Sequence, residues 1–141
     1  MRLLSVPLAL SALLLYSCSS EPAIKDAIEV VKAGTLPSHQ SQAIGSAFDA
    51  AFPEGKWTTY ETSALAGMGM TVVQFDATVD SGVLVRAGIR DPAAPSGPVP
   101  IQFQFLFSDN KTFGLSYVGV PEQITSEPQI KSILAFVYHR L

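Results

Sequence analysis

The sequence predicts a small α+β domain in which helices cover one face of an antiparallel sheet. Apolar residues recur at helical spacing in two segments near the N-terminus and in one segment at the C-terminus. Between them, apolar and polar residues alternate, which is typical of half-buried strands. We therefore expect two short N-terminal helices, an antiparallel sheet of three to four strands and a C-terminal helix, arranged in two layers.

A chain of 141 residues has the size of one ordinary domain. Hydrophobic residues make up 48% of it and charged residues 15%, which excludes a disordered, solvating chain. The formal net charge is −3 and the lysines are dispersed, so the sequence shows no basic patch for nucleic acid. We expect a single α+β domain over residues 23–141 that does not bind nucleic acid.

The two N-terminal helices are predicted from their apolar stripes and end signals. Gly34 supplies the stop of the first helix, and Ser41 is placed to cap the second. Each helix is about three turns long, which is too short to be stable alone, so both must pack on another element. The stripes consist of Ile24, Ala27, Ile28 and Val31 in the first helix and Ile44, Ala47, Phe48, Ala51 and Phe52 in the second.

The sheet is predicted from segments in which every second residue is apolar. Residues 71–80 show this alternation, and it returns more strongly at residues 99–107. A turn at residues 108–111 leads back through Phe113, Leu115 and Tyr117 in the same alternation, which predicts a hairpin. A further short strand at residues 82–89 is a weaker prediction, because Arg86 interrupts it.

The C-terminal helix is predicted from a capping box followed by an apolar stripe. Ser126 and Gln129 have the capping-box spacing. The stripe consists of Ile130, Ile133, Leu134 and Val137. Such a helix would cover the sheet.

The N-terminus predicts a signal peptide. Arg2 supplies a short positive region, and an apolar stretch of about 13 residues follows, whereas a spanning helix needs roughly 20. The stretch ends in Leu15, Tyr16, Ser17 and Cys18. This ending resembles the lipobox of bacterial lipoproteins, which has an aliphatic residue, a small residue directly before the cysteine, and the cysteine. Tyr16 departs from the usual small residue, at the permissive position of the motif.

The lipobox resemblance implies that residues 1–17 are removed, that Cys18 carries lipid, and that residues 18–22 form a short tether. Two or three acyl chains, at about 0.8 kcal/mol per buried methylene, would hold the protein on its membrane. Cys18 is the only cysteine, so it cannot form an internal disulfide, and lipidation gives it a covalent use. The alternative is a plain secreted protein whose cysteine merely falls near the cut.

Residues 19 and 20 are both serine rather than the aspartate that resembles an inner-membrane retention signal. The expected location is therefore the bacterial cell envelope, with the protein lipid-anchored in the outer membrane and facing the periplasm.

The sequence contains no residue set with the spacing of a catalytic or metal site. His39 and His139 have no second histidine or cysteine at ligand spacing, and there is no G-x-S-x-G nucleophile motif. The glycines at residues 67 and 69 precede a strand, whereas a dinucleotide fingerprint follows a strand and opens a helix. We therefore expect no enzymatic activity, no cofactor and no bound metal.

Five residues are candidates for contact with a partner. Met68 and Met70 can form an adaptable apolar contact, with a flexible loop into the strand as the alternative. Trp57 is either an exposed aromatic that recognises a partner or a core plug between the second helix and the sheet. Pro95 and Pro98 lie in the proline-rich segment 91–100, which is either a binding loop or a spacer.

Four segments, at residues 31–36, 43–48, 56–57 and 72–75, resemble a recurring, functionally uncharacterised domain of membrane-tethered bacterial proteins. The layout of two short helices and a meander on a lipid tether is also similar to that of the small outer-membrane assembly lipoproteins related to BamE, an analogy of arrangement.

These features favour a non-enzymatic protein-binding or adaptor module that contacts another envelope protein at the membrane surface. The alternative is a periplasmic inhibitor or immunity lipoprotein that blocks a cell-wall hydrolase by inserting residues 67–70 or 91–100. A small enzyme is a third class.

Overall fold

The computed structural model describes residues 20–139, with side chains described from Asp26 onward; Cys18 and the predicted signal peptide lie outside these residues. The elements follow in the order α1 (Ser20–Ala33), α2 (Ile44–Ala51), β1 (Lys56–Tyr60), α3 (Ser63–Gly67), β2 (Met70–Asp80), α4 (Ser81–Arg86), β3 (Pro98–Ser108), β4 (Phe113–Gly119) and α5 (Glu127–His139). The strands form one antiparallel sheet in the order β1-β2-β3-β4, which confirms the predicted α+β class.

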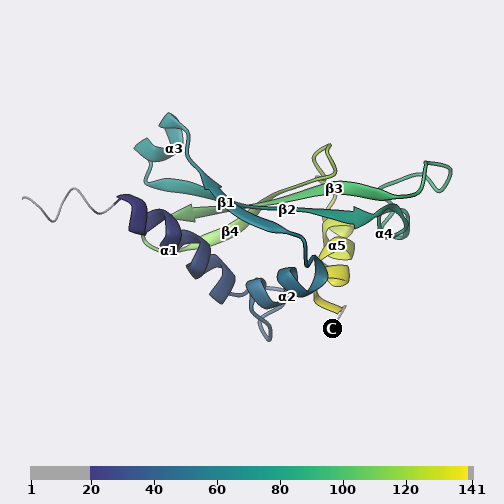
Figure 1. The fold of residues 1–141 in the computed structure, drawn as a ribbon, viewed down its shortest axis with the longest axis horizontal. Helices are drawn as coiled ribbons and strands as arrows, with labels where there is room; N and C mark the ends of the chain where they lie inside the picture. The colour runs from purple at the N-terminus through teal and green to yellow at the C-terminus, as the bar shows by residue number, and fades with distance from the viewer. Residues whose placement is uncertain (1–19, 140–141) are drawn as a thin grey trace, which may run out of the picture.

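The helices are distributed unevenly about the sheet. Figure 1 shows α1, α2 and α5 on one side of it and the short α3 on the other, while α4 lies at the far end of the long strands β2 and β3. No helix within residues 20–139 is long and apolar enough to cross a membrane. One face of the sheet is thus covered by three helices, and most of the other is left without a helix.

The hydrophobic core lies between the sheet and these three helices. Phe48 of α2 packs edge-on against Phe75 of β2 and Phe103 of β3, with ring centroids 5.4 and 4.8 Å apart. Each such pair contributes about 0.5–1.5 kcal/mol beyond burial of its area. The three predicted helical stripes supply much of the rest, with Ala27, Val31, Ile44, Ala47, Ala51, Phe52, Ile133, Leu134 and Val137 buried.

The predicted hairpin is formed by β3 and β4, but its alternation is interrupted. A register shift between Gln104 and Phe105 leaves Ser116 as an extra residue in β4, and the Ser116 hydroxyl donates to the carbonyl of Gln104 at 3.2 Å. Such a bulge moves the following residues to the opposite face. Leu115 therefore pairs with the core residue Phe105, whereas Tyr117 pairs with Gln104 and leaves the face that the uninterrupted alternation predicts.

The weak strand predicted at residues 82–89 is wrong, because its first part is α4. The Asp80 carboxylate accepts a hydrogen bond from the backbone N–H of Gly82 at 2.7 Å and caps the helix. Within α4, Val83 and Leu84 are both buried, which a strand would not allow for neighbouring residues on a half-buried sheet. β1 and α3, each only five residues long, were not predicted from the sequence.

The start of α1, the N-cap of α2 and one capping contact of α5 differ from the prediction. α1 begins at Ser20, so residues 20–22, expected in the tether, are helical. α2 has Ala43 rather than Ser41 as its N-cap, and the N–H of Ile44 is satisfied by the carbonyl of Gly34 at 2.8 Å. In α5, the Gln129 amide donates to the Gly88 carbonyl at 2.8 Å, so this side chain ties α5 to the segment after α4.

Candidate binding surface

The sheet face that points away from α1, α2 and α5, here called the open face, gathers most of the polar side chains of the strands. Successive side chains of a strand point to opposite faces, so the partners of the buried residues form it. Its members are Lys56, Thr58 and Tyr60 of β1, Met70, Val72, Gln74, Asp76 and Thr78 of β2, Pro98, Pro100, Gln102, Gln104 and Leu106 of β3, and Tyr117 of β4.

A closed hydrogen-bonded network, here called the amide network, occupies the middle of the open face. It consists of Gln74, Asp76, Gln102 and Gln104. The Gln104 amide donates to the side-chain carbonyls of Gln74 and Gln102, both at 3.1 Å. The amides of Gln74 and Gln102 in turn donate to the two carboxylate oxygens of Asp76, at 2.7 and 2.9 Å. All four side chains are half-buried, so each orients its neighbours while staying in reach of solvent.

The register of the sheet explains why the amide network closes. Gln74 pairs with Gln104, and Asp76 pairs with Gln102, across the central strands β2 and β3. Residues two apart on one strand lie on the same face, so two neighbouring cross-strand pairs form a four-membered patch. On the β1 side, Lys56 pairs with Asp76, which sets a positive charge opposite the carboxylate.

Tyr117 adjoins the amide network from β4 and lies over Gly119. A Cβ atom at position 119 would come within 2.7 Å of the Tyr117 ring atoms Cε1 and Cζ, so the tyrosine occupies the space that a side chain there would need. The Tyr117 hydroxyl donates to the Pro121 carbonyl at 3.4 Å. Gly119 is also the register partner of Gln102, which places the aromatic ring beside the glutamines.

One end of the open face is apolar. This apolar end comprises Tyr60, Met68, Met70, Val72 and Leu106. Tyr60, Val72 and Leu106 form a cross-strand row, and Val72 is buried although it faces away from the main core. The tyrosine is 42% exposed and Met68, the C-cap of α3, is 61% exposed.

The segment that carries Met68 and Met70 is tied down at Gly69. This glycine adopts φ +68°, a left-handed conformation that favours glycine, and its carbonyl accepts a hydrogen bond from the N–H of Asp109 at 2.9 Å. At the start of α3, the Thr62 hydroxyl caps the helix by accepting from the N–H of Leu65 at 3.2 Å. Met68 and Met70, two of the five predicted contact residues, therefore lie close together on the open face, in a segment that backbone hydrogen bonds hold in place.

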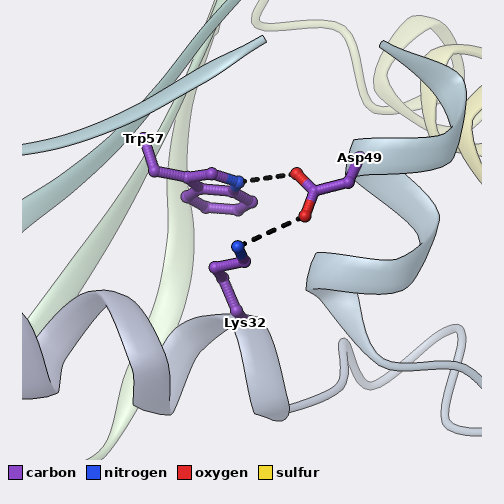
Figure 2. A network of polar contacts seen from close by, with 3 residues as sticks. All are labelled: Lys32, Asp49 and Trp57. Atoms are coloured by element: carbon purple, nitrogen blue, oxygen red, sulfur yellow. Dashed lines mark hydrogen bonds and ion pairs between the residues drawn. The ribbon is translucent and has the colours of Figure 1, made fainter. Parts of the chain in front are cut away.

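Trp57, a third predicted contact residue, lies on the opposite, helix-covered face of β1. Its indole N–H donates to Asp49 of α2 at 2.9 Å, and Lys32 of α1 pairs with the other carboxylate oxygen of Asp49 at 3.3 Å (Figure 2). The Lys32 ammonium also lies over the indole, 5.8 Å from its centroid. Trp57 packs against Phe75 with ring centroids 4.7 Å apart. Through these contacts Trp57 packs between the second helix and the sheet, which is the alternative that the sequence left open. A contact between Trp57 and a partner stays a prediction.

Pro95 and Pro98 lie at the end of the sheet remote from the methionines. Pro98 begins β3 on the open face, and Pro95 lies in the preceding loop, which reaches outward beside α4 in Figure 1. The loop is closed at its base, where Ser81 and Gly97 exchange two hydrogen bonds: the N–H of Ser81 donates to the Gly97 carbonyl at 2.9 Å, and the Ser81 hydroxyl accepts from the N–H of Gly97 at 3.1 Å. The structure thus separates the two prolines from Met68 and Met70.

Two adjoining hollows of about 420 and 320 Å³ share the segment that leads into α5. The larger lies between this segment, α4 and the start of β3, and the smaller lies between it and β4. Their charged lining residues are Arg90 and Glu122, both in the larger hollow, and the lining contains no histidine or cysteine.

Elsewhere, His39 stacks on Tyr138 with ring centroids 4.2 Å apart. Within residues 20–139, no group of three or more His, Cys, Asp or Glu residues is placed to hold a metal ion.

The amide network and Tyr117 were missed by the sequence analysis. Gln74, Asp76, Gln102 and Gln104 are visible in the sequence as the polar members of two alternating strands, but that pattern also describes an ordinary solvated face. Only the register of β2 against β3 shows that they form one patch.

No family model, no curated protein and no solved structure matches this chain.

Proposed function

We propose that this chain is a lipid-anchored envelope protein that acts as a non-enzymatic protein-binding or adaptor module at the membrane surface. The proposal rests on the exposed apolar side chains at one end of the sheet. Tyr60 and Met68 are the exposed large hydrophobic residues within the described part of the chain, and both belong to the apolar end of the open face. Aromatic residues and methionine are enriched in protein interfaces, and clustered apolar exposure on a folded domain marks an interaction surface.

The contact surface at the apolar end combines a fixed part with an adaptable part. Tyr60 is held in the cross-strand row with Val72, while Met68 carries a flexible thioether that can fit an irregular partner. An aromatic anchor with an adaptable neighbour suits recognition of a protein surface.

The anchoring part of the proposal rests on the lipobox-like sequence that ends at Cys18. Ser20, the first described residue of α1, is only two residues after Cys18 in the sequence, so a lipid on Cys18 would lie close to this helix along the chain. A partner of the open face would then lie close to the membrane, on the periplasmic side of the outer membrane.

Site-specific photocrosslinking in cells tests the proposal. A photoreactive amino acid at position 60, within the apolar end, should give a discrete crosslinked species with an envelope protein. The same probe at Lys131, which is exposed on α5 and thus on the helix side of the sheet, is the matched control. An equal pattern from both positions, or no species from position 60, would contradict the proposal.

An inhibitor or immunity lipoprotein against a cell-wall hydrolase is a second candidate, favoured by the shape of residues 91–97. This loop reaches away from the sheet and is clamped at its base by Ser81 and Gly97, while the Asp91 carboxylate accepts from the N–H of Ala93 at 2.8 Å. A loop that is held at its base and ordered by an internal hydrogen bond can enter a cleft at a reduced entropic cost. Wall-hydrolase activity that is unchanged by the purified chain would exclude this candidate.

A further inference from the structure

The amide network is pre-organised and keeps hydrogen-bonding capacity for a ligand. Gln104 uses both N–H groups of its amide within the network, whereas Gln74 and Gln102 each use one. Among the described residues, the network therefore leaves one N–H on Gln74, one N–H on Gln102 and the side-chain carbonyl of Gln104 without a protein partner. Two donors and an acceptor are thus held close together on planar groups.

Tyr117 adds an aromatic surface beside these polar groups. Because position 119 is glycine, nothing from its own strand lifts the tyrosine away from the sheet. The hydroxyl at the outer end of the side chain makes a long hydrogen bond, of 3.4 Å, to the Pro121 carbonyl. The negatively polarised face of an aromatic ring attracts weakly positive C–H groups, which sugars present on one side of their rings.

The chemistry of this patch favours a neutral, hydroxyl-rich ligand. The core of a protein interface is mainly apolar, and a protein docked here would have to cover four polar side chains at a desolvation cost. The patch has no net charge that would attract a strongly charged ligand, because the positive charge of Lys56 pairs across the strands with the negative charge of Asp76. A sugar hydroxyl both donates and accepts, so neighbouring hydroxyls can use the two free N–H groups and the free carbonyl together.

We infer that the amide network and Tyr117 form a binding site for a neutral glycan chain, separate from the apolar end proposed to contact a protein. The glutamines hydrogen-bond adjacent hydroxyl or acetamido groups, and the Tyr117 ring supports the apolar side of one sugar. Asp76 is a positioning residue, because its carboxylate holds Gln74 and Gln102 in orientation.

The test uses the full chain, labelled with ¹⁵N and purified in detergent micelles. The N-acetylglucosamine tetramer and maltotetraose are neutral soluble probes, and co-sedimentation with insoluble chitin, a neutral polymer of N-acetylglucosamine, examines the polymer. We expect at least one of these ligands to bind saturably. For a soluble probe, the side-chain NH₂ signals of Gln74, Gln102 and Gln104 should shift, while that of the exposed Gln40, remote in sequence, should not.

Substitutions at two positions, Gln104 and Tyr117, test whether binding occurs at this site. Gln104→Val keeps a residue that favours strands and should weaken binding about tenfold or more. Tyr117→Ala should weaken it similarly, whereas Tyr117→Phe keeps the ring and should bind nearly as well as the wild type. Gln40→Ala is the matched glutamine control, and urea unfolding confirms that each variant is folded.

The inference is overturned if neither the oligosaccharides nor the chitin binds. It is equally overturned if the shifts map elsewhere, or if Gln104→Val binds as tightly as the wild type. If position 104 instead crosslinks to a protein while no glycan binds, the occupant of the patch is a protein. None of these results changes the expectation for a probe at position 60, so the two proposals fail separately.

Discussion

Tyr117 and Gly119 are coupled on the open face, because the tyrosine ring fills the space above the glycine. The bulge at Ser116 turns Tyr117 to this face, and the glycine two residues later lets the ring lie down beside the glutamines. An aromatic side chain that covers a strand glycine is a known way of stabilising such a position. The pair therefore links the local geometry of β4 to the surface proposed for ligand binding.

The first prediction concerns Gly119→Ala. The added methyl group meets the Tyr117 ring, so we expect the free energy of unfolding to fall by about 1–3 kcal/mol. Gly114→Ala on the same strand is the control, since a Cβ there meets nothing within 4 Å and should leave stability unchanged or slightly raised. Urea unfolding measures both. In a double-mutant cycle, the loss should shrink when Tyr117 is also changed to Ala; a purely additive result would show that the two residues are not coupled.

A second prediction separates the two bonds made by Asp49. Asp49→Asn keeps an acceptor for the Trp57 indole but removes the ion pair with Lys32. These groups are partly exposed, so we expect a change within about 0.5 kcal/mol. Asp49→Ala also leaves the indole N–H without its acceptor and should destabilise the chain by about 1–2 kcal/mol. Denaturant unfolding compares the two variants, and equal losses would mean that the hydrogen bond between α2 and β1 contributes nothing.

The third prediction follows from Tyr138, whose buried hydroxyl has no hydrogen-bond partner among the described residues. Burial raises the pKa of Tyr138 to about 12 from its usual value near 10. Below about pH 10 the hydroxyl is protonated in both states, so this pKa shift leaves the folding equilibrium unaffected there. As the pH rises from about 10 to 12, the unfolded chain loses this proton first, and stability should decline.

Tyr138→Phe removes this contribution to the alkaline decline while the remaining tyrosines stay. Because the variant also removes an unsatisfied buried hydroxyl, we expect its stability at neutral pH to be unchanged or raised by about 1 kcal/mol. Urea midpoints measured from neutral pH to about pH 11 give the comparison. The same alkaline slope in both proteins would show that Tyr138 titrates normally in the folded state.

The fourth prediction concerns the proposed anchor. In cells, Cys18→Ala should stop lipidation, so that the protein no longer partitions with membranes, and the lipoprotein signal peptidase inhibitor globomycin should change the size of the wild type. Membrane fractionation and gel mobility give both readouts. Wild-type behaviour of Cys18→Ala in both would show that Cys18 is not lipidated.

The sequence predicts the parts of the fold that depend on periodicity. The stripes of α1, α2 and α5 and the alternation in β2 and β3 place most of the expected side chains in the core, because helix and strand periods directly determine which residues face it. Ile28 and Ile130 are half-buried, and the side chain of Ile24 lies outside the described residues. The strand prediction for residues 82–89 failed because Val83, Val85 and Ile89 favour a strand by residue type, while the Asp80 cap and the packing of α4 on α5 stabilise a helix. β1 and α3 are too short to give a periodic signal.

The candidate surface was predictable only in part. Met68 and Met70 were recognised as adaptable apolar residues, and the structure adds Tyr60, which reaches the same end through the pairing of β1 with β2. The amide network depends on cross-strand register, and the position of Tyr117 depends on a bulge, neither of which has a local sequence signal here. Residue type alone therefore could not show the polar half of the open face.

The most direct measurement of the central claim is the yield of the photocrosslink from position 60 in cells that produce Met68→Asp or Met68→Leu. Both substitutions lie at an exposed residue and should leave the fold intact. If the apolar end binds an envelope protein, Met68→Leu keeps the crosslink, while Met68→Asp reduces it about tenfold or more, because a buried charge is costly in an interface. An unchanged yield in Met68→Asp would contradict the account.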